Sequence, residues 1–262
     1  MTYTKKASKR CLKQMTASEI ILYMESLRDE KQRKVLMRFF KTGKGEYGEG
    51  DDFLGLKVPQ TRSIVKNVTD LPFEEIPQLL DNHFHEIRLC GLLLLVWHFE
   101  KNATRRLAYD NDAIKARDKT VKCYIENIER ANNWDLVDLS APKILGRWLL
   151  LPTSLGDKTA IMDQLATANN LWRQRVSMVS TWTTLRAGDS DWCLRYAKMH
   201  LRHPHDLMNK AVGWMLREMG KHISMDLLRD FLREHIHEMP RTTLRYAIEK
   251  MMDEERKEWL RV

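Results

Sequence analysis

The hydrophobic positions of this chain recur three and four residues apart in almost every segment after residue 17. That spacing places apolar side chains on one face of a helix, whereas the strict alternation typical of strands is scarce. The 11 glycines and 7 prolines fall mostly between these segments, where they end helices or form turns. The pattern predicts an all-α protein.

One stretch interrupts the helical pattern. Residues 41–62, KTGKGEYGEGDDFLGLKVPQTR, contain five glycines and the adjacent acidic residues Asp51 and Asp52. This composition predicts an extended loop. Pro59 is expected to open the next helix, because the missing N–H of proline costs nothing in the first helical turn.

Several of the expected helices share a pattern, with a basic residue near the start followed by small or apolar residues. They span residues 85–99, 171–185, 207–221 and 241–251, and their basic residues are Arg88, Arg175, Lys210 and Arg245. The last three basic residues follow one another at intervals of 35 residues. Helix pairs repeated every ~35–45 residues are typical of α-solenoids, in which the second helix of each pair lines the concave surface. We therefore expect an α-solenoid of HEAT-like helix pairs with a concave basic groove.

The helical pattern divides the chain into a tail and one domain. We expect residues 1–17 to form a basic flexible tail and residues 18–262 to form a single HEAT-like-repeat domain. The tail lacks the apolar run of a signal peptide, and its cations would add only non-specific attraction to phosphates. The longest apolar run, residues 92–97, is far shorter than the ~20 residues that span a bilayer.

The composition of the chain indicates which class of partner it binds and which cellular compartment it occupies. Among 262 residues, 44 Lys and Arg face 36 Asp and Glu, so the formal net charge of +8 favours polyanions such as nucleic acid. Cys11, Cys90, Cys123 and Cys193 lie far apart, as reduced thiols of an intracellular protein do, and form no zinc motif. We expect a cytoplasmic protein, associated with the nucleoid if the chain is bacterial.

Candidate chemistry is concentrated in residues 132–141, NNWDLVDLSA. Trp134 and Asp138 stand four residues apart where a helix begins, so an indole and a carboxylate share one helix face. An isolated pair of this kind is usually structural, with a packed ring and a solvated carboxylate near the helix start. Here the repeat pattern places the pair on the same row as Arg175 and Lys210, which favours a function.

The other tryptophans divide into two groups. Trp214 follows Lys210 by one helical turn and precedes Arg217, and aromatic rings among cations can contact sugars, bases or cationic ligands while phosphates are bound nearby. Four other tryptophans are expected to fill the core between helix pairs. They are Trp97, Trp172, Trp182 and Trp192.

These motifs resemble a known family. In this order, FLGLKVPQTR (53–62), NNWDLVDLSA, LWRQR (171–175) and KAVGWMLREMGK (210–221) are similar to the DNA alkylation repair family of AlkD-type HEAT-like-repeat alkylpurine DNA glycosylases. The resemblance covers about residues 40 to 250. It implies a monofunctional enzyme that removes N3-methyladenine and N7-methylguanine from duplex DNA, holds the duplex in a wide groove without a base-flipping pocket, and leaves an abasic site.

The resemblance also implies roles for individual residues. Asp138 matches the family's catalytic aspartate, Trp134 and Trp214 match two tryptophans that flank the lesion nucleotide, and Arg175 matches an arginine that supports the DNA backbone at the active site. Tyr47 corresponds to a tyrosine in the N-terminal part of the cleft. The residues that we expect to contact DNA are Tyr47, Arg88, Arg173, Lys210, Arg217, Arg241 and Arg245.

The chemistry of such an enzyme explains why these residue types are needed. An alkylated purine carries a positive charge and is a good leaving group, and its departure leaves cationic character on the deoxyribose. A fixed carboxylate near C1′ stabilises that charge and orients the attacking water. Indole faces beside it add about 0.5–2 kcal/mol each.

Other motifs exclude other chemistries. The His-x-His pairs are expected to be structural or to lie on the surface, since side chains at i and i+2 of a helix point apart: His83/His85, His203/His205 and His235/His237. The sequence GKGEYGEG lacks the Lys-Ser/Thr ending of a phosphate-binding loop.

We expect no cofactor, no metal and no membrane, and a monomer that binds double-stranded DNA containing alkylated purines. The alternative is a non-catalytic HEAT-repeat module that binds DNA or protein, because solenoids usually serve as scaffolds.

Overall fold

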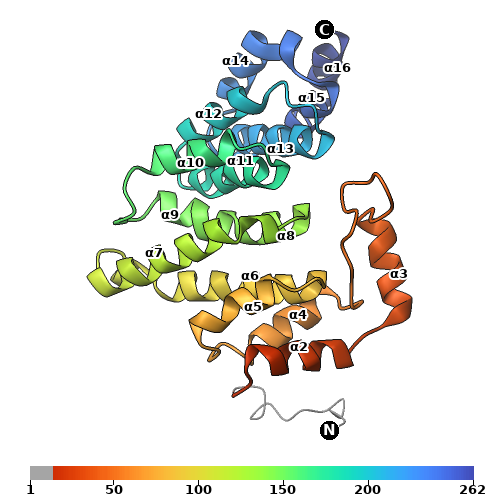
Figure 1. Ribbon diagram of the computed structural model, residues 1–262. Coiled ribbons are helices and arrows are strands. Elements are labelled where there is room, and N and C mark those ends of the chain that lie inside the picture. Colours follow the sequence, from red (N-terminus) through yellow and green to blue (C-terminus); the bar gives the residue numbers. More distant parts are fainter. Residues whose placement is uncertain (1–13) are drawn as a thin grey trace. The chain divides into compact units, whose positions relative to one another are not determined.

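The computed structural model describes residues 14–262, so the cations of the predicted tail, Lys5, Lys6, Lys9 and Arg10, lie outside the described residues. In residues 14–262 the regular structure is helical, and the β-type pairing is limited to an isolated bridge between Asp52 and Phe84. The chain forms two compact parts, one ending at Leu136 and one running from Val137 to Val262. The predicted all-α class is confirmed, and within each part successive helices stack as they do in an α-solenoid (Figure 1).

Helix α6 forms the centre of the first part. It contains the LLLLVW run and is apolar around its circumference, so it is buried along most of its length. Helices α4, α5 and α7 pack against it, and α2 packs against α5. The helices of this part are α2 (Ala17–Ser26), α3 (Glu30–Phe39), α4 (Val58–Val65), α5 (Ile76–Leu80), α6 (His85–Lys101) and α7 (Asn111–Glu126).

The predicted glycine-rich loop joins α3 to α4, and α4 starts at Val58 with Pro59 in its first turn, as predicted. A buried carboxylate anchors the end of this loop, because Glu86 of α6 accepts hydrogen bonds from the backbone N–H groups of Leu54, Gly55 and Leu56 at 2.8–2.9 Å. Gly55 has φ +92°, and a Cβ there would lie 2.2 Å from the carbonyl oxygen of Asp29. Only glycine fits this close approach.

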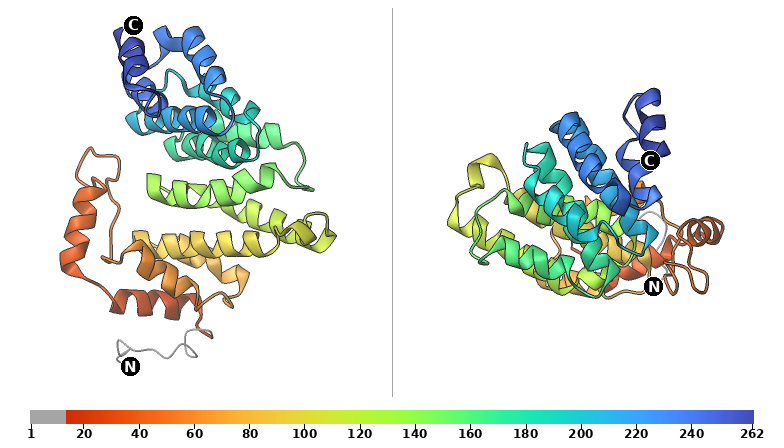
Figure 2. Two further views of the ribbon diagram at one scale, coloured as in Figure 1. Left: turned by 180° about the vertical axis from the view of Figure 1, so that it is seen from behind. Right: turned by 90° about the horizontal axis from the view of Figure 1, so that it is seen from above.

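The second part repeats one packing scheme. Helices α10 and α12 pack against the long helix α11, α12 and α14 pack against the long helix α13, and α11, α13 and α15 form a continuous layer (Figure 2). The helices of this part are α9 (Arg147–Leu149), α10 (Lys158–Ala166), α11 (Leu171–Arg186), α12 (Asp191–His200), α13 (Asp206–His222), α14 (Met225–His235), α15 (Arg241–Ala247) and α16 (Asp253–Arg261).

Helix α8 (Trp134–Ser140) begins in the first part and ends in the second. A π-helical turn, Pro142–Gly146, follows it and packs against α11. A Cβ on Gly146 would lie 2.4 Å from the carbonyl oxygen of Ser180, so the two backbones meet here without a side chain between them.

The predicted helices agree with α6, α11 and α13 to within two residues at each end. Helix α15 ends at Ala247, short of the predicted residue 251, and the turn that follows buries Ile248 and Met251. The thiols of Cys90, Cys123 and Cys193 are free and buried, as expected of reduced cysteines. Between residues 14 and 262, every helix is too short or too polar to cross a bilayer.

The structure corrects the expectation that four tryptophans fill the core. Trp172 is buried, but Trp97, Trp182 and Trp192 are only half-buried and do not fill the core. Long cationic side chains cover two of these rings instead, because the Lys101 ammonium lies 4.1 Å from the centre of the Trp97 ring and the Arg186 guanidinium lies 5.1 Å from that of Trp182. The tryptophan that is fully buried is Trp148.

Candidate functional site

Helix α8 is the central element of the candidate site, because it carries Trp134 in its first turn and Asp138 one turn later. The preceding residue, Asn133, is buried, and its side-chain oxygen accepts a hydrogen bond from the Trp134 backbone N–H at 2.8 Å. This contact satisfies one of the free N–H groups at the helix start. The four-residue spacing places the indole and the carboxylate on the same face of α8, as the sequence predicts.

A bidentate ion pair fixes the Asp138 carboxylate. Arg175 of α11 donates from Nε to Oδ1 at 3.0 Å and from Nη2 to Oδ2 at 2.9 Å. Its remaining nitrogen, Nη1, donates to the carbonyl oxygen of Leu207 in the first turn of α13 at 2.5 Å. Arg175 therefore connects α8, α11 and α13 through one planar group, a geometry that lysine cannot reproduce.

The two side chains of this ion pair differ in how far they are exposed to solvent. The Arg175 side chain is 5% exposed, whereas the Asp138 side chain is 19% exposed. The guanidinium is therefore committed to the protein, while the Asp138 side chain keeps part of its surface exposed. An anionic group that is both oriented and accessible can stabilise positive charge that develops beside it.

The Trp134 indole lies among other aromatic rings of the first part. Its Nε1–H donates to the hydroxyl oxygen of Tyr47 at 3.1 Å, and its ring centre lies 5.5 Å from that of Phe40 and 6.0 Å from that of Phe39. Trp134 and Tyr47 are both half-buried. The structure brings together these two sequence-predicted residues, which are 87 positions apart.

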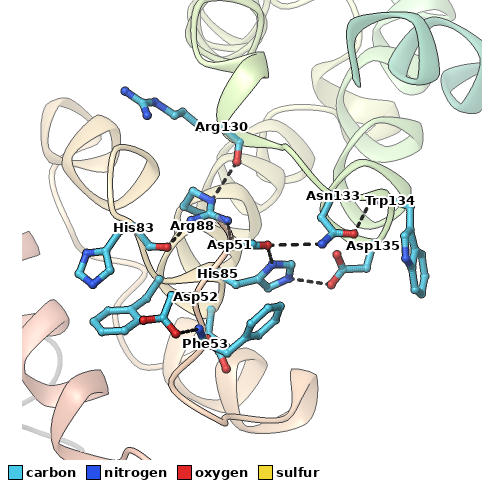
Figure 3. Close-up of polar contacts among 12 residues, drawn as sticks. Asp51, Asp52, Phe53, His83, His85, Arg88, Arg130, Asn133, Trp134 and Asp135 are labelled. Carbon is cyan, nitrogen blue, oxygen red and sulfur yellow. Dashed lines mark hydrogen bonds and ion pairs between the residues drawn. The ribbon is translucent and has the colours of Figure 1, made fainter. Parts of the chain in front are cut away.

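A buried polar network holds the start of α8 (Figure 3). His85, the first residue of α6, lies between two carboxylates, with Nδ1 2.8 Å from Asp51 Oδ2 and Nε2 2.9 Å from Asp135 Oδ2. Asn133 Nδ2 donates to Asp51 at 3.4 Å, and the Phe53 ring stacks on the His85 ring with centres 4.4 Å apart. The network ties the glycine-rich loop, through Asp51, to both α6 and α8.

The charges in this network stabilise one another. Burial by itself would lower the pKa of His85, but the carboxylates of Asp135 and Asp51 outweigh burial and raise that pKa to about 9. Burial likewise opposes ionisation of Asp51, yet hydrogen bonds and charge from His85 and Arg88 hold the pKa of Asp51 below its usual value. His85 is therefore an imidazolium at neutral pH that bridges two buried carboxylates.

Arg88 belongs to this network and not to an exposed basic groove. Its side chain is 5% exposed and its Nη2 lies 2.5 Å from Asp51 Oδ1. It also donates to the backbone carbonyl oxygens of Asn82, His83 and Arg130. The sequence predicts that Arg88 contacts DNA, whereas the structure places its side chain in the interior, where each of the three guanidinium nitrogens makes at least one hydrogen bond.

The other sequence-predicted residues lie in the second part. Trp214 is half-buried on α13, and Lys210 one turn before it pairs with Asp206 at 2.8 Å. Arg217 pairs with Glu218 and Glu249. Arg241 and Arg245 are exposed on α15, and Arg173 is half-buried on α11. Of the four repeat cations expected to line the concave basic groove, Arg88 and Arg175 are buried in ion pairs, whereas Lys210 is half-buried and Arg245 is exposed.

Sequence reasoning missed the network of Asp51, His85 and Asp135. The sequence shows Asp51 as a loop acid and His85 as half of a His-x-His pair, and the positions that bind one another are 34 and 50 residues apart. Asp135 could have pointed to this network, because it is a second acid inside the WDLVD segment and has no role in the predicted chemistry. In the described residues 14–262, no group of three or more His, Cys, Asp or Glu side chains is arranged to hold a metal ion.

Residues 20–251 match the family described as DNA alkylation repair enzyme. A solved structure described as a predicted DNA alkylation repair enzyme from Enterococcus faecalis superposes with a TM-score of 0.63 at 16% identity, covering 86% of this chain and 97% of that one. At that identity the likeness concerns the fold. A search of curated proteins found no match.

Proposed function

Because the chain belongs to the DNA alkylation repair enzyme family, we propose that it is a monofunctional DNA glycosylase. Its substrates are positively charged alkylated purines in duplex DNA, N3-methyladenine and N7-methylguanine, and it hydrolyses the N-glycosidic bond. Membership of the family establishes a role in DNA repair. The specific reaction is the proposal, and the held but accessible carboxylate of Asp138 carries it.

Asp138 acts on the sugar. As the cationic purine leaves, electron deficiency moves to C1′ and the ring oxygen of the deoxyribose. The Asp138 carboxylate stabilises this centre by charge and accepts a proton from the water that attacks C1′. The products are the free base and an abasic site. Both of the carboxylate oxygens are oriented before substrate arrives, because Arg175 holds each of them.

The tryptophans act with the carboxylate. The indole of Trp134, on the same face of α8, offers an electron-rich ring to the cationic sugar or base. Trp214 is assigned the matching role on α13 by resemblance to the family. Tyr47, Arg173, Lys210, Arg217, Arg241 and Arg245 are proposed to contact the DNA backbone. Selectivity arises from the lability of the alkylated base, so a pocket for an extruded base is not part of this mechanism.

The test is excision from methylated DNA. Purified protein is incubated with a duplex containing a single N7-methylguanine, and alkali then cleaves the strand wherever a base has been lost. We expect strand breaks well above the spontaneous depurination measured without protein. A duplex that is bound but broken only at the spontaneous rate would show a non-catalytic DNA-binding module instead.

A further inference from the structure

Helix α3 has an apolar surface that the described chain does not cover. None of its residues from Glu30 to Phe39 is buried, and Val35 and Phe39 are 55% and 61% exposed. These two side chains are one helical turn apart, so they form a continuous strip. Apolar side chains kept in water forgo the free energy of burial, and a contiguous strip of them marks a surface for a partner.

The same face of α3 is cationic. Lys31, Val35, Arg38 and Phe39 recur at i, i+4, i+7 and i+8 and therefore share one side of the helix. Lys31 and Arg38 are exposed, and neither forms an ion pair within residues 14–262. The single acid of this helix, Glu30, is neutralised by Arg28 and Arg33. The net positive charge of the face complements a polyanion and would repel a basic partner.

The strip leads directly to the candidate site. The Phe39 ring meets the Trp134 ring edge-on, with centres 6.0 Å apart, and meets the Phe40 ring at 4.9 Å. Trp134 in turn donates to Tyr47. Phe39, Trp134 and Tyr47 thus form one aromatic surface within the first part of the chain, with Phe39 as its most exposed member.

We propose that α3 is a DNA-binding element in which the Phe39 ring packs on a sugar or base next to the nucleotide that Trp134 contacts. Lys31 and Arg38 bind phosphates on the same strand segment. Duplex DNA is favoured over a protein partner because the strip adjoins Trp134 and Tyr47 and its free charges are all positive. The choice of duplex DNA as the occupant rests on the proposed function.

The two kinds of contact have different signatures. A ring that packs on a sugar or base releases no counterions, so its loss weakens binding equally at all salt concentrations. An arginine on a phosphate releases counterions, so its loss weakens binding and lowers the slope of log affinity against log salt by about one. Affinity and salt slope together therefore distinguish Phe39 from Arg38.

The test measures binding of a fluorescein-labelled duplex without any lesion, by anisotropy over a salt series. Phe39→Ala is expected to raise Kd about fivefold or more without a change in slope. Arg38→Ala is expected to raise Kd and lower the slope by about one. The matched controls are Tyr109→Ala, which removes a ring that is 82% exposed, and Lys115→Ala, which removes an exposed cation of α7.

The outcome is independent of catalysis. Wild-type affinity in Phe39→Ala, or losses of equal size in Tyr109→Ala and Lys115→Ala, would overturn the role of α3. A wild-type protein that binds this duplex through Phe39 and Arg38 but excises no methylated base would overturn the glycosylase proposal alone. Thermal unfolding of each variant is the control for its fold, and we expect the wild-type unfolding temperature because the substituted positions are exposed.

Discussion

The Asp138 carboxylate is oriented by a neighbour that is itself fixed at three atoms. Arg175 uses Nε and Nη2 for Asp138 and Nη1 for the Leu207 carbonyl, and its side chain is almost fully buried. A carboxylate on a freely rotating side chain would reorganise during the reaction, whereas this one is already in place. Such preorganisation is a major source of electrostatic catalysis.

Arg175→Lys is expected to lower the excision rate at least about tenfold while duplex affinity stays near the wild-type value. Lysine keeps the charge but can bind only one carboxylate oxygen at a time, so Asp138 loses its orientation. Single-turnover excision and anisotropy measure the two quantities.

The control for this variant is Arg195→Lys, which alters another bidentate pair in the second part, Arg195 with Asp163. It should leave excision unchanged. Equal excision rates in Arg175→Lys and wild type would remove Arg175 from the mechanism as the group that positions Asp138.

His85 gives the fold a dependence on pH. Its pKa is about 9 when folded and 6.5 when unfolded, since its two carboxylate partners outweigh burial. A group with a raised folded pKa stabilises the fold fully below the unfolded pKa and loses that contribution as pH rises through the folded pKa. The free energy of unfolding should therefore fall between pH 6.5 and about 9, by on the order of 3 kcal/mol.

Urea denaturation at a series of pH values measures this fall. His85→Asn should be less stable at neutral pH and should show no fall attributable to this site, whereas His237→Asn, at an exposed position, should keep it. A wild-type protein of constant stability across that range would mean that His85 is not an imidazolium in the fold.

At the scale of elements, the sequence was informative wherever spacing decides the structure. The recurrence of apolar residues located α6, α11 and α13, and the glycine content of residues 41–57 located the loop. The spacing of Trp134 and Asp138 predicted that they share a helix face. Each of these features depends on residues within a few positions of one another, so no knowledge of the tertiary fold was needed.

Ion pairs between residues that are far apart in the sequence could not be predicted. Arg88 has the helix position of a groove-lining cation, but it is buried because its guanidinium pairs with Asp51, which is 37 residues away in the sequence. Arg175 was expected at the active site, yet its partnership with Asp138, also 37 residues away, could not be read from spacing. A sequence shows that a charge exists, and only the fold shows which opposite charge it meets.

The close packing of α13 on α15 yields a prediction about stability. A Cβ at Gly213 would lie 2.5 Å from the carbonyl oxygen of Thr243, a backbone atom, and 2.5 Å from the Cβ of Tyr246. Gly213→Ala should lower the free energy of unfolding by about 1–3 kcal/mol, because the backbones must separate.

The control lies in the same helix. At Gly220 the nearest atom is the Cδ2 methyl of Leu228, which can rotate away, so Gly220→Ala should cost far less. Urea denaturation compares the two variants. If Gly213→Ala proves as stable as Gly220→Ala, the backbones of α13 and α15 are not in contact as described.

At the scale of the whole molecule, the proposed function assigns DNA binding and chemistry to different residues. The formal net charge of +8 attracts any duplex, and the exposed cations Lys31, Arg38, Arg241 and Arg245 are spread over both parts of the chain. Asp138 adds a negative charge to a protein that must bind a polyanion, so it opposes affinity for DNA. In the proposed mechanism its negative charge is needed in the transition state, in which the sugar is cationic.

Asp138→Asn provides the most direct test of this account, with excision of N7-methylguanine under single-turnover conditions measured beside the affinity for a lesion-free duplex. The account predicts an excision rate lower by about 100-fold or more, with affinity unchanged or slightly stronger because a charge that repels phosphates is gone. An excision rate equal to that of the wild type, in a variant that binds the duplex normally, would contradict it.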